Sequence, residues 1–264
     1  MPEGDTLHKL ARYLSPRLSG QALQGFEAPQ AQRALVIKDD TVLDVHARGK
    51  HLVVRFQSGR SLRVHLGMHG SFHHYHHNAH WKRSPRTAQV ILATDNGVYV
   101  CFRPTKVEFT RAKPPNALRL LGPDLADGAP TTLQLKERVE AALERSPRVD
   151  DLLLDQQVAC GIGNVYKSEI LFIHQMSPHR LVERLTPREW TDLYATGAHL
   201  LRDNLRGGPR VTTRQSLPEL NAQGSNLWVY GRRALPCYRC GSQIQKVMTG
   251  RQARITYWCP GCQS

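Results

Sequence analysis

The first hydrophobic pattern along the chain is helical. Five apolar residues recur at spacings of three and four, which places them on one face of a helix. They are Leu7, Leu10, Ala11, Leu14 and Leu18. Asp5 or Thr6 can cap the start of this helix, and Gly20 can end it. The chain is therefore predicted to open with a short amphipathic helix.

From about residue 34 to 109, apolar and polar residues alternate in short runs, as in strands. The clearest runs pair as 52–56 with 61–66 and as 89–93 with 98–102. Gln57-Ser-Gly-Arg60 and Asp95-Asn96-Gly97 separate the two pairs and have the composition of hairpin turns. The pattern predicts a β-sandwich or a flattened barrel.

After a stretch rich in Pro, Gly and Asn, the pattern becomes helical. The predicted helices span 132–145, 149–156, 164–174 and 187–205. The last has Thr186 as N-cap, Pro187 at its first position and Glu189 for a capping box. Its residues Trp190, Leu193, Tyr194 and Leu201 form an apolar stripe that we expect in the core. The fold class is thus α+β, with a leading helix on the N-terminal layer.

Four cysteines near the end of the chain are spaced as metal ligands. Cys237 and Cys240 form one C-x2-C pair, and Cys259 and Cys262 form a second after 18 intervening residues. This spacing is typical of a four-thiolate zinc ribbon, a closed tetrahedral site that stabilises a fold. Two alternating runs divided by Gly250 predict a β-hairpin between the pairs. We therefore expect one structural Zn²⁺.

Two disulfides, or a redox-active pair, are the alternatives for these thiols. The start MPEGDTLHKL lacks the features of a signal peptide, and no apolar stretch approaches the length of a membrane span. We therefore expect an intracellular, cytoplasmic protein with reduced thiols, which suits zinc. The remaining Cys101 and Cys160 are expected as small buried hydrophobes.

The charge balance narrows the class of partner. Lys plus Arg number 36 against 22 Asp plus Glu, which gives a net charge of +14 and a pI near 9.9. Such an excess favours a polyanion, and nucleic acid is the leading candidate. A membrane surface would require a basic amphipathic helix with large apolar residues opposite, and none stands out.

A glycine-containing turn precedes the third predicted helix of the C-terminal part. Gly161 and Gly163 allow a close approach, and Asn164 opens the helix with Lys167 one turn on. Backbone amides at a helix N-terminus can seat a phosphate, which would make Asn164 and Lys167 DNA contacts. By itself a G-x-G before a helix is more often only a turn.

Three segments together resemble the Fpg/Nei DNA glycosylases, the family of formamidopyrimidine-DNA glycosylase and endonuclease VIII. They are Met1-Pro2-Glu3-Gly4, the segment from Gly161 to Glu169, and Arg254 with the terminal Trp258-Cys-Pro-Gly-Cys262. The resemblance covers the whole chain. It implies a β-sandwich domain (1–115), a hinge (116–130), a helix-two-turn-helix domain (131–226) and a zinc finger (227–264). It also implies a monomer that holds damaged DNA, duplex, bubble or single-stranded, between its lobes.

The resemblance implies that Met1 is removed and that the amine of Pro2 is the nucleophile. An α-amino group titrates near about 8, against about 10.4 for a lysine side chain, so more of it is free base at neutral pH. Attack on the sugar expels the base and leaves an iminium, which acidifies the adjacent sugar carbon and permits strand cleavage. Glu3 is the expected proton shuttle.

The resemblance assigns three further residues to the DNA backbone. Lys50 is expected on a strand entering the cleft, as a phosphate contact and proton donor for β-elimination. Arg254 is expected to grip a phosphate and assist δ-elimination, and Asn164 to hold a phosphate beside the lesion. Met68 is the candidate wedge that fills the gap left by a flipped base; a core methionine is the alternative.

The chain departs from the Fpg branch of the family at one informative place. That branch has an Asp-Pro-Arg-Arg-Phe-Gly stretch that inspects the opposite base, whereas this chain reads Phe102-Arg-Pro-Thr-Lys-Val-Glu-Phe109. The difference favours the Nei branch and oxidised pyrimidines. Thr6 also stands where an acidic residue is common. The alternatives are an Fpg-like glycosylase for oxidised purines and a non-catalytic zinc-ribbon protein that binds damaged DNA.

Two segments remain outside these assignments. Five histidines lie between His73 and His80, and we expect a surface loop that contacts DNA or water rather than a second metal site. The polar stretch 212–226 is expected to be a mobile lesion-recognition loop.

Overall fold

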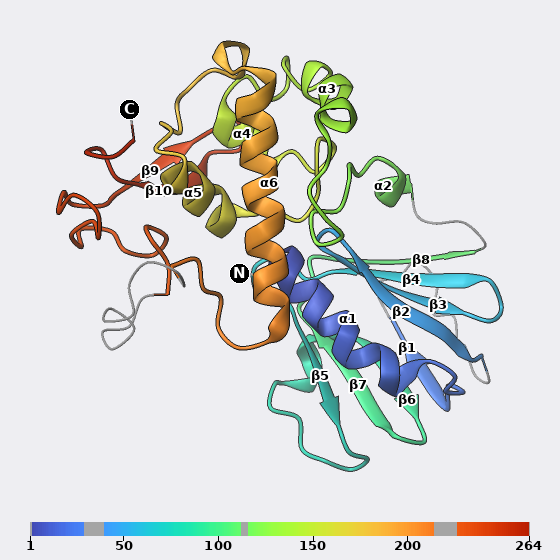
Figure 1. The fold of residues 1–264 in the computed structure, drawn as a ribbon. Helices are drawn as coiled ribbons and strands as arrows, with labels where there is room; N and C mark the ends of the chain where they lie inside the picture. Colours follow the sequence, from blue (N-terminus) through green and yellow to red (C-terminus); the bar gives the residue numbers. More distant parts are fainter. Residues whose placement is uncertain (1, 29–39, 112–115, 214–225, 264) are drawn as a thin grey trace. The chain divides into compact units, whose positions relative to one another are not determined.

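The structure is a computed structural model, and it describes residues 2–28, 40–111, 116–213 and 226–263. The chain divides into two compact units, residues 1–120 and 121–264 (Figure 1). Among the helices described, none combines the length and the apolar character needed to cross a bilayer.

The first unit contains two four-stranded antiparallel sheets, with strand orders β1-β6-β7-β5 and β2-β3-β4-β8. The strands are β1 (Gly25–Glu27), β2 (Val42–Arg48), β3 (His51–Phe56), β4 (Arg60–His65), β5 (Ser71–Tyr75), β6 (Ala88–Thr94), β7 (Gly97–Phe102) and β8 (Lys106–Arg111). Alternate residues such as Leu52, Val64 and Leu92 are buried in one shared core. The predicted β-sandwich and its two hairpins, β3–β4 and β6–β7, are confirmed.

Helix α1 (Gly4–Leu18) packs its apolar face, including Leu7, Leu14 and Leu18, into the core of the sandwich. The helix begins earlier than predicted, because its N-cap is Glu3 rather than Asp5 or Thr6. The Glu3 N–H donates to Thr6 Oγ1 at 3.4 Å, so Thr6 satisfies a backbone group of the cap instead of being the cap.

The second unit is built around α3 (Thr132–Glu140), α4 (Val149–Leu154), α5 (Asn164–Ile173) and α6 (Pro187–Asp203) (Figure 1). All four predicted helices exist, each ending one to five residues earlier than the sequence suggested. The α6 capping box is confirmed, since the Glu189 N–H donates to Thr186 Oγ1 at 3.2 Å. The apolar stripe of α6 is in the core, as expected. Leu125, in the predicted hinge, also belongs to this core.

The short helix α2 (Asn116–Arg119) precedes this unit, and 3-10 turns lie at Pro85–Thr87, Val182–Arg184 and Asn204–Arg206. The chain ends in the predicted hairpin of β9 (Gln245–Thr249) and β10 (Arg254–Trp258). The hairpin is attached to α5, because the Tyr257 N–H donates to Ser168 Oγ at 3.3 Å. Around it a small core forms from Phe172, Trp228 and Ile244.

Candidate active site and DNA interface

Pro2 and Glu3 lie immediately before the first turn of α1. Pro2 is half-buried, while the Glu3 side chain is fully buried. The Glu3 carbonyl accepts the N–H groups of Thr6 at 3.0 Å and Leu7 at 3.2 Å. The helix therefore fixes the backbone directly beside the proposed nucleophile.

Lys50 lies in the two-residue turn between β2 and β3, not on a strand as expected. Gly49, the first residue of the turn, has φ 55°, the left-handed conformation that favours glycine. The flanking Arg48 and His51 are paired across the hairpin. The strands thus hold the half-buried Lys50 at a well-defined tip.

Next to Lys50, the sheet β2-β3-β4-β8 carries a group of polar residues that the sequence interpretation did not single out. His51 and His65 are opposite each other on β3 and β4, with ring centroids 4.9 Å apart. Arg63 Nη1 lies 3.1 Å from His51 Nδ1, and Arg63 also pairs with Glu108 of β8. The alternation of Arg63 and His65 with the core residue Val64 is the sequence signal that places them on the other face.

Met68 lies in the connection between β4 and β5 and is 56% exposed. The alternative of a core methionine is therefore wrong, and the wedge role stays a prediction. The connection is tight, since the Gly70 N–H donates to the Leu66 carbonyl at 3.0 Å. A Cβ on Gly67 would lie 1.6 Å from Thr105 Oγ1, so only glycine fits there.

Asn164 is the first residue of α5, after Gly163 as N-cap, and its side chain is half-buried. The preceding turn is held by Gln156, whose Oε1 accepts the Gly161 N–H and whose Nε2 donates to the Ile162 carbonyl, both at 3.0 Å. An ordered turn before the helix N-terminus suits the proposed phosphate seat.

Lys167 requires a correction. Its side chain has no exposed surface, and its Nζ donates to the Ile255 carbonyl of β10 at 3.3 Å. A fully buried ammonium group cannot reach a phosphate of bound DNA. In this structure Lys167 instead links α5 to the C-terminal hairpin.

Glu169, in the same motif, has a structural role that its sequence position did not reveal. Its buried carboxylate accepts the N–H groups of Trp228, Val229 and Tyr230 at 2.7, 2.9 and 2.8 Å, and the Thr212 hydroxyl also donates to it. Burial raises the pKa of Glu169, but four donors around one carboxyl group oppose protonation, so we assign the ionised form. Glu169 therefore anchors the segment that leads into the cysteine pairs.

The four sulfurs of Cys237, Cys240, Cys259 and Cys262 all lie within 4.8 Å of one another. Two of the separations are 3.8 Å, between Cys237 and Cys262, and 3.4 Å, between Cys240 and Cys259. All six cysteines are free thiols, and Cys101 and Cys160 are buried as expected. Burial raises the pKa of Cys101 to about 12, so this thiol is unreactive.

Arg254 is the first residue of β10, exposed at the turn of the hairpin, with Nε 3.4 Å from Gln252 Oε1. The turn is held from α4, because the Arg251 N–H donates to Asp151 Oδ1 at 2.9 Å and to Oδ2 at 3.1 Å. The position of Arg254 therefore depends on a contact between Asp151 and the turn that precedes it.

Comparisons with known proteins agree with these features. Residues 1–108 match the family model of the formamidopyrimidine-DNA glycosylase N-terminal domain, and residues 121–215 match that of its H2TH domain. A probable endonuclease 8 2 of Streptomyces coelicolor is 35% identical over 100% of this chain and 94% of its own length. The chain belongs to the Fpg/Nei family.

Two further matches of this Fpg/Nei chain extend over its whole length. The DNA-(apurinic or apyrimidinic site) lyase Nei2 of Mycolicibacterium smegmatis is 32% identical over 100% of this chain and 99% of its own. The crystal structure of Lactococcus lactis formamidopyrimidine-DNA glycosylase, noncovalently bound to DNA containing an AP site, superposes with a TM-score of 0.79. It covers 99% of both chains at 22% identity, which shows the common fold.

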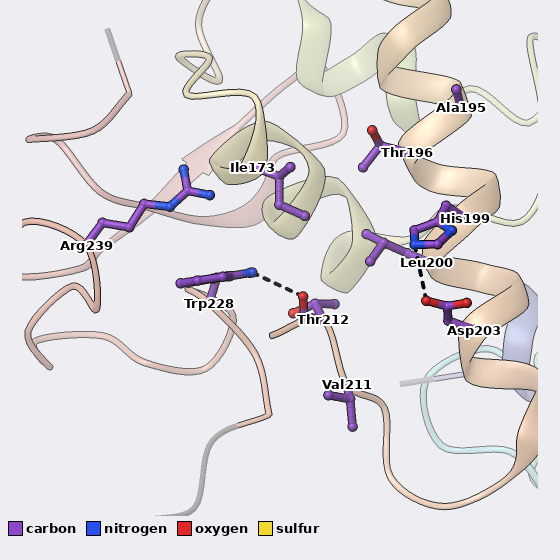
Figure 2. A pocket seen from close by; sticks show the side chains of 10 residues that line it. All are labelled: Ile173, Ala195, Thr196, His199, Leu200, Asp203, Val211, Thr212, Trp228 and Arg239. Atoms are coloured by element: carbon purple, nitrogen blue, oxygen red, sulfur yellow. Dashed lines mark hydrogen bonds and ion pairs between the residues drawn. The ribbon is translucent and has the colours of Figure 1, made fainter. Parts of the chain in front are cut away.

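The Fpg/Nei chain also has a pocket of about 580 Å³ inside its second unit (Figure 2). The pocket is lined by Ile173, Ala195, Thr196, His199, Leu200, Asp203, Val211, Thr212, Trp228 and Arg239. His199 pairs with Asp203 at 3.3 Å, and the Trp228 indole N–H donates to the Thr212 carbonyl at 3.1 Å (Figure 2). Thr212, at the start of the predicted lesion-recognition loop, is among the lining residues, but Pro2, Glu3, Lys50, Asn164 and Arg254 are not, so the pocket is not part of the catalytic site.

The histidine-rich segment of the Fpg/Nei chain forms strand β5 and the loop after it. His74 stacks on Tyr99 with centroids 4.4 Å apart, and His77 Nε2 lies 3.2 Å from the Asp95 carbonyl. Within the described part of the chain, the cysteine group is the one cluster of at least three metal ligands. A contact of these histidines with DNA stays a prediction. Most of the predicted lesion-recognition loop, residues 214–225, lies outside the described residues.

Proposed function

We propose that this Fpg/Nei chain is a bifunctional DNA glycosylase and AP lyase of base-excision repair that removes oxidised bases, in particular oxidised pyrimidines. The observation that carries the proposal is the Pro2-Glu3 pair fixed at the N-cap of α1, in a chain aligned over its full length with a relative named AP lyase. The nucleophile is the Pro2 amine exposed by removal of Met1. The iminium that a secondary amine forms with the sugar has no N–H to lose. It therefore stays cationic and acidifies the adjacent sugar carbon.

The proposed reaction uses the residues of each unit in turn. The lone pair of Pro2 N forms a bond to C1′, the glycosidic bond breaks, and the base leaves with the proton that the Pro2 nitrogen gives up. Glu3 protonates the sugar ring oxygen, which opens the ring and gives the iminium. The Glu3 carboxylate then takes up a C2′ proton, which breaks the C3′–O bond, and a second elimination with loss of the C4′ proton breaks the C5′–O bond. Lys50, Asn164 and Arg254 hold the phosphates that become leaving groups.

A structural Zn²⁺ in the C-terminal module is part of the proposal. A tetrahedral ion with Zn–S bonds of about 2.3 Å requires sulfurs about 3.8 Å apart. The Cys237–Cys262 separation is 3.8 Å, the Cys240–Cys259 separation is 3.4 Å, and all four sulfurs lie within 4.8 Å of one another, a group compact enough to close around one ion. When bound, the ion stabilises the hairpin that carries Arg254 and takes no part in the reaction.

The preference for pyrimidine lesions is supported by the segment that replaces the Fpg inspection loop. Lys106 to Arg111 form the regular strand β8. The Phe109 ring packs against Phe26 and Phe56 with centroids 5.6 and 6.1 Å away, in the sandwich core. An aromatic residue held there cannot intercalate beside an opposite base. The segment therefore lacks the apolar wedge of the Fpg branch.

Borohydride trapping tests the proposal. The mature protein, incubated with an abasic-site duplex and borohydride, should form a covalent adduct, and Pro2→Gly or retention of Met1 should abolish it. Side-by-side cleavage of thymine glycol, dihydrouracil and 8-oxoguanine duplexes should favour the two pyrimidine lesions. Tight binding to damaged DNA without any trapped adduct would instead identify a non-catalytic binding protein. Preferred cleavage of 8-oxoguanine would assign the Fpg-like activity.

A further inference from the structure

The contact between Arg63 and His51 determines where the imidazole proton lies. Arg63 Nη1 is 3.1 Å from His51 Nδ1. A guanidinium group has only N–H donors, so Nδ1 of His51 must be the acceptor. The single ring proton is then on Nε2. His51 is a neutral imidazole that presents an N–H donor on the side away from Arg63.

The arrangement is built into the sheet. Arg63 is 2% exposed, and its Nε donates to Glu108 Oε2 at 2.9 Å while its Nη2 also pairs with that carboxylate. Arg63 and Glu108 are register partners on β4 and β8, as are His51 and His65 on β3 and β4. A guanidinium fixed by a carboxylate cannot rotate away from the imidazole, so the direction of the contact is set by strand pairing.

The surroundings of His51 attract anions. From residue 45 to residue 94 the sequence contains no Asp or Glu. The charged and titratable groups around the imidazole are Arg48 of β2, Lys50 of the turn, Arg63 and His65 of β4, and Lys106 and Glu108 of β8. Burial of the ring is the main cause that lowers the pKa of His51, and the nearby His65 and basic side chains lower it further, to about 3. Burial also lowers the pKa of His65. Both rings are therefore uncharged at neutral pH.

We infer that the Nε2–H of His51 binds a phosphodiester oxygen of the DNA next to Lys50, and that Arg63 and Glu108 fix the tautomer for this contact. Among residues 2–28, 40–111, 116–213 and 226–263, no group forms a hydrogen bond with His51 Nε2, and the side chain is half-buried. The adjacent Lys50 supplies the positive charge that attracts the phosphate, and His51 supplies a hydrogen-bond donor of fixed orientation. The inference rests on the proposed function, because that function brings the phosphate to Lys50.

A neutral histidine donor makes the pH dependence of DNA binding different from that of a histidine that titrates near neutral pH. Its hydrogen bond to phosphate does not change as pH passes through 6.5, the ordinary pKa of histidine. Removing Arg63 should raise the pKa of His51, since a neighbouring cation and a donor to Nδ1 are both lost while the Glu108 carboxylate remains. Binding by the Arg63→Met variant should then strengthen as pH falls.

Two measurements that need no catalysis test the contact. Nitrogen-15 NMR of the full chain at pH 7 should show His51 as the neutral tautomer protonated at Nε2. Binding of a duplex with a tetrahydrofuran abasic analogue should weaken roughly tenfold in His51→Leu, from loss of a hydrogen bond to a charged group. His51→Gln keeps an N–H at the same place along the side chain and should bind within about threefold of wild type.

The pH dependence separates the contact from a structural role. Between pH 8 and 6, the affinity difference between wild type and His51→Gln should stay constant. Arg63→Met should gain affinity over this range, and the double variant with His51→Gln should lose that gain. His199→Leu removes an exposed histidine of α6 in the second unit, where no DNA contact is proposed, and should bind as wild type. If Arg63→Met fails to fold, the NMR tautomer and the His51 pair still decide the question.

An imidazolium or an Nδ1–H tautomer at pH 7 would overturn the inference, as would wild-type binding by His51→Leu. The outcome is separable from the proposed enzymatic function. If borohydride trapping failed but His51→Leu still bound DNA more weakly than His51→Gln, the proposed reaction would be wrong and the His51 contact would stand. If trapping were normal but the two His51 variants bound DNA equally, the reaction would stand and the His51 contact would be wrong.

Discussion

The carboxylate of Glu169 accepts the backbone N–H of Trp228 at 2.7 Å, although 59 positions separate the two residues. Glu169 lies on α5, the helix that Asn164 opens, and Trp228 lies just before the cysteine pairs. The same carboxylate accepts the N–H groups of the next two residues. One buried side chain thus attaches the C-terminal module to the helix that is proposed to hold a phosphate.

Replacing this carboxylate should therefore be costly. Glu169→Gln keeps the shape but places an amide NH₂ against N–H donors, and we expect the free energy of unfolding to fall by about 3 kcal/mol. Chemical denaturation of the purified chain measures the loss. Glu137→Gln removes an exposed carboxylate from α3 and should change stability by less than about 0.5 kcal/mol. Equal stability of the two variants would contradict the anchoring role.

The second prediction concerns Gly250, in the turn before Arg254. Gly250 has φ +73°, and a Cβ there would lie 2.3 Å from Asp151 Oδ1. Gly250→Ala should therefore push the turn off α4 and displace Arg254. On an abasic-site duplex, the ratio of δ- to β-elimination product should fall several-fold, while borohydride trapping through Pro2 persists.

Gly231 is the matched control for this substitution. It has φ +79°, but a Cβ there would meet nothing within 4 Å. Gly231→Ala should show only the conformational strain of the left-handed backbone, about 1–2 kcal/mol, with an unchanged product ratio. A normal ratio in Gly250→Ala would show that Arg254 does not depend on Asp151.

The features predicted correctly from the sequence are local ones. The Thr186–Glu189 capping box depends on two residues three positions apart. The four-cysteine group follows from two C-x2-C motifs, whose spacing specifies the geometry of a metal site. Lys167 and Glu169 belong to a recognised motif, yet the DNA contact predicted for Lys167 was wrong and no role was predicted for Glu169. Their partners, Ile255 and Trp228, lie 88 and 59 positions away, and nothing within the motif identifies them.

The group around His51 shows the same limit for a sheet. Its members come from three strands, and only the register brings Arg63 beside Glu108 and His51 beside His65. A shift of one residue would reverse the face of every side chain, so the contact could not be deduced before the pairing was known. The family resemblance implied a role for Lys50 but did not point to Arg63 or Glu108, which orient the neighbouring His51.

Acid stability gives a third prediction. The pKa of His51 is about 3 in the folded chain, below its ordinary value of 6.5, so between these values the unfolded chain binds a proton that the folded chain does not. Stability is unaffected by this group above pH 6.5 and falls as pH decreases from 6.5 toward 3. His51→Gln should flatten the decrease relative to wild type, as measured by thermal unfolding at a series of pH values. Parallel curves for the two proteins would show that His51 is protonated in the folded state.

Zinc content tests the C-terminal module directly. The purified chain should contain one Zn²⁺ by metal analysis, and Cys240→Ser should lower the content because one of four ligands is lost. Cys101→Ala removes a buried thiol of the first unit and should retain one ion per chain. Chelation should reduce DNA binding and lyase activity together, because the hairpin that carries Arg254 loses its support. Full activity after verified loss of the metal would show that Arg254 keeps its position without it, and would leave attachment through Glu169 and Asp151 as the sufficient cause.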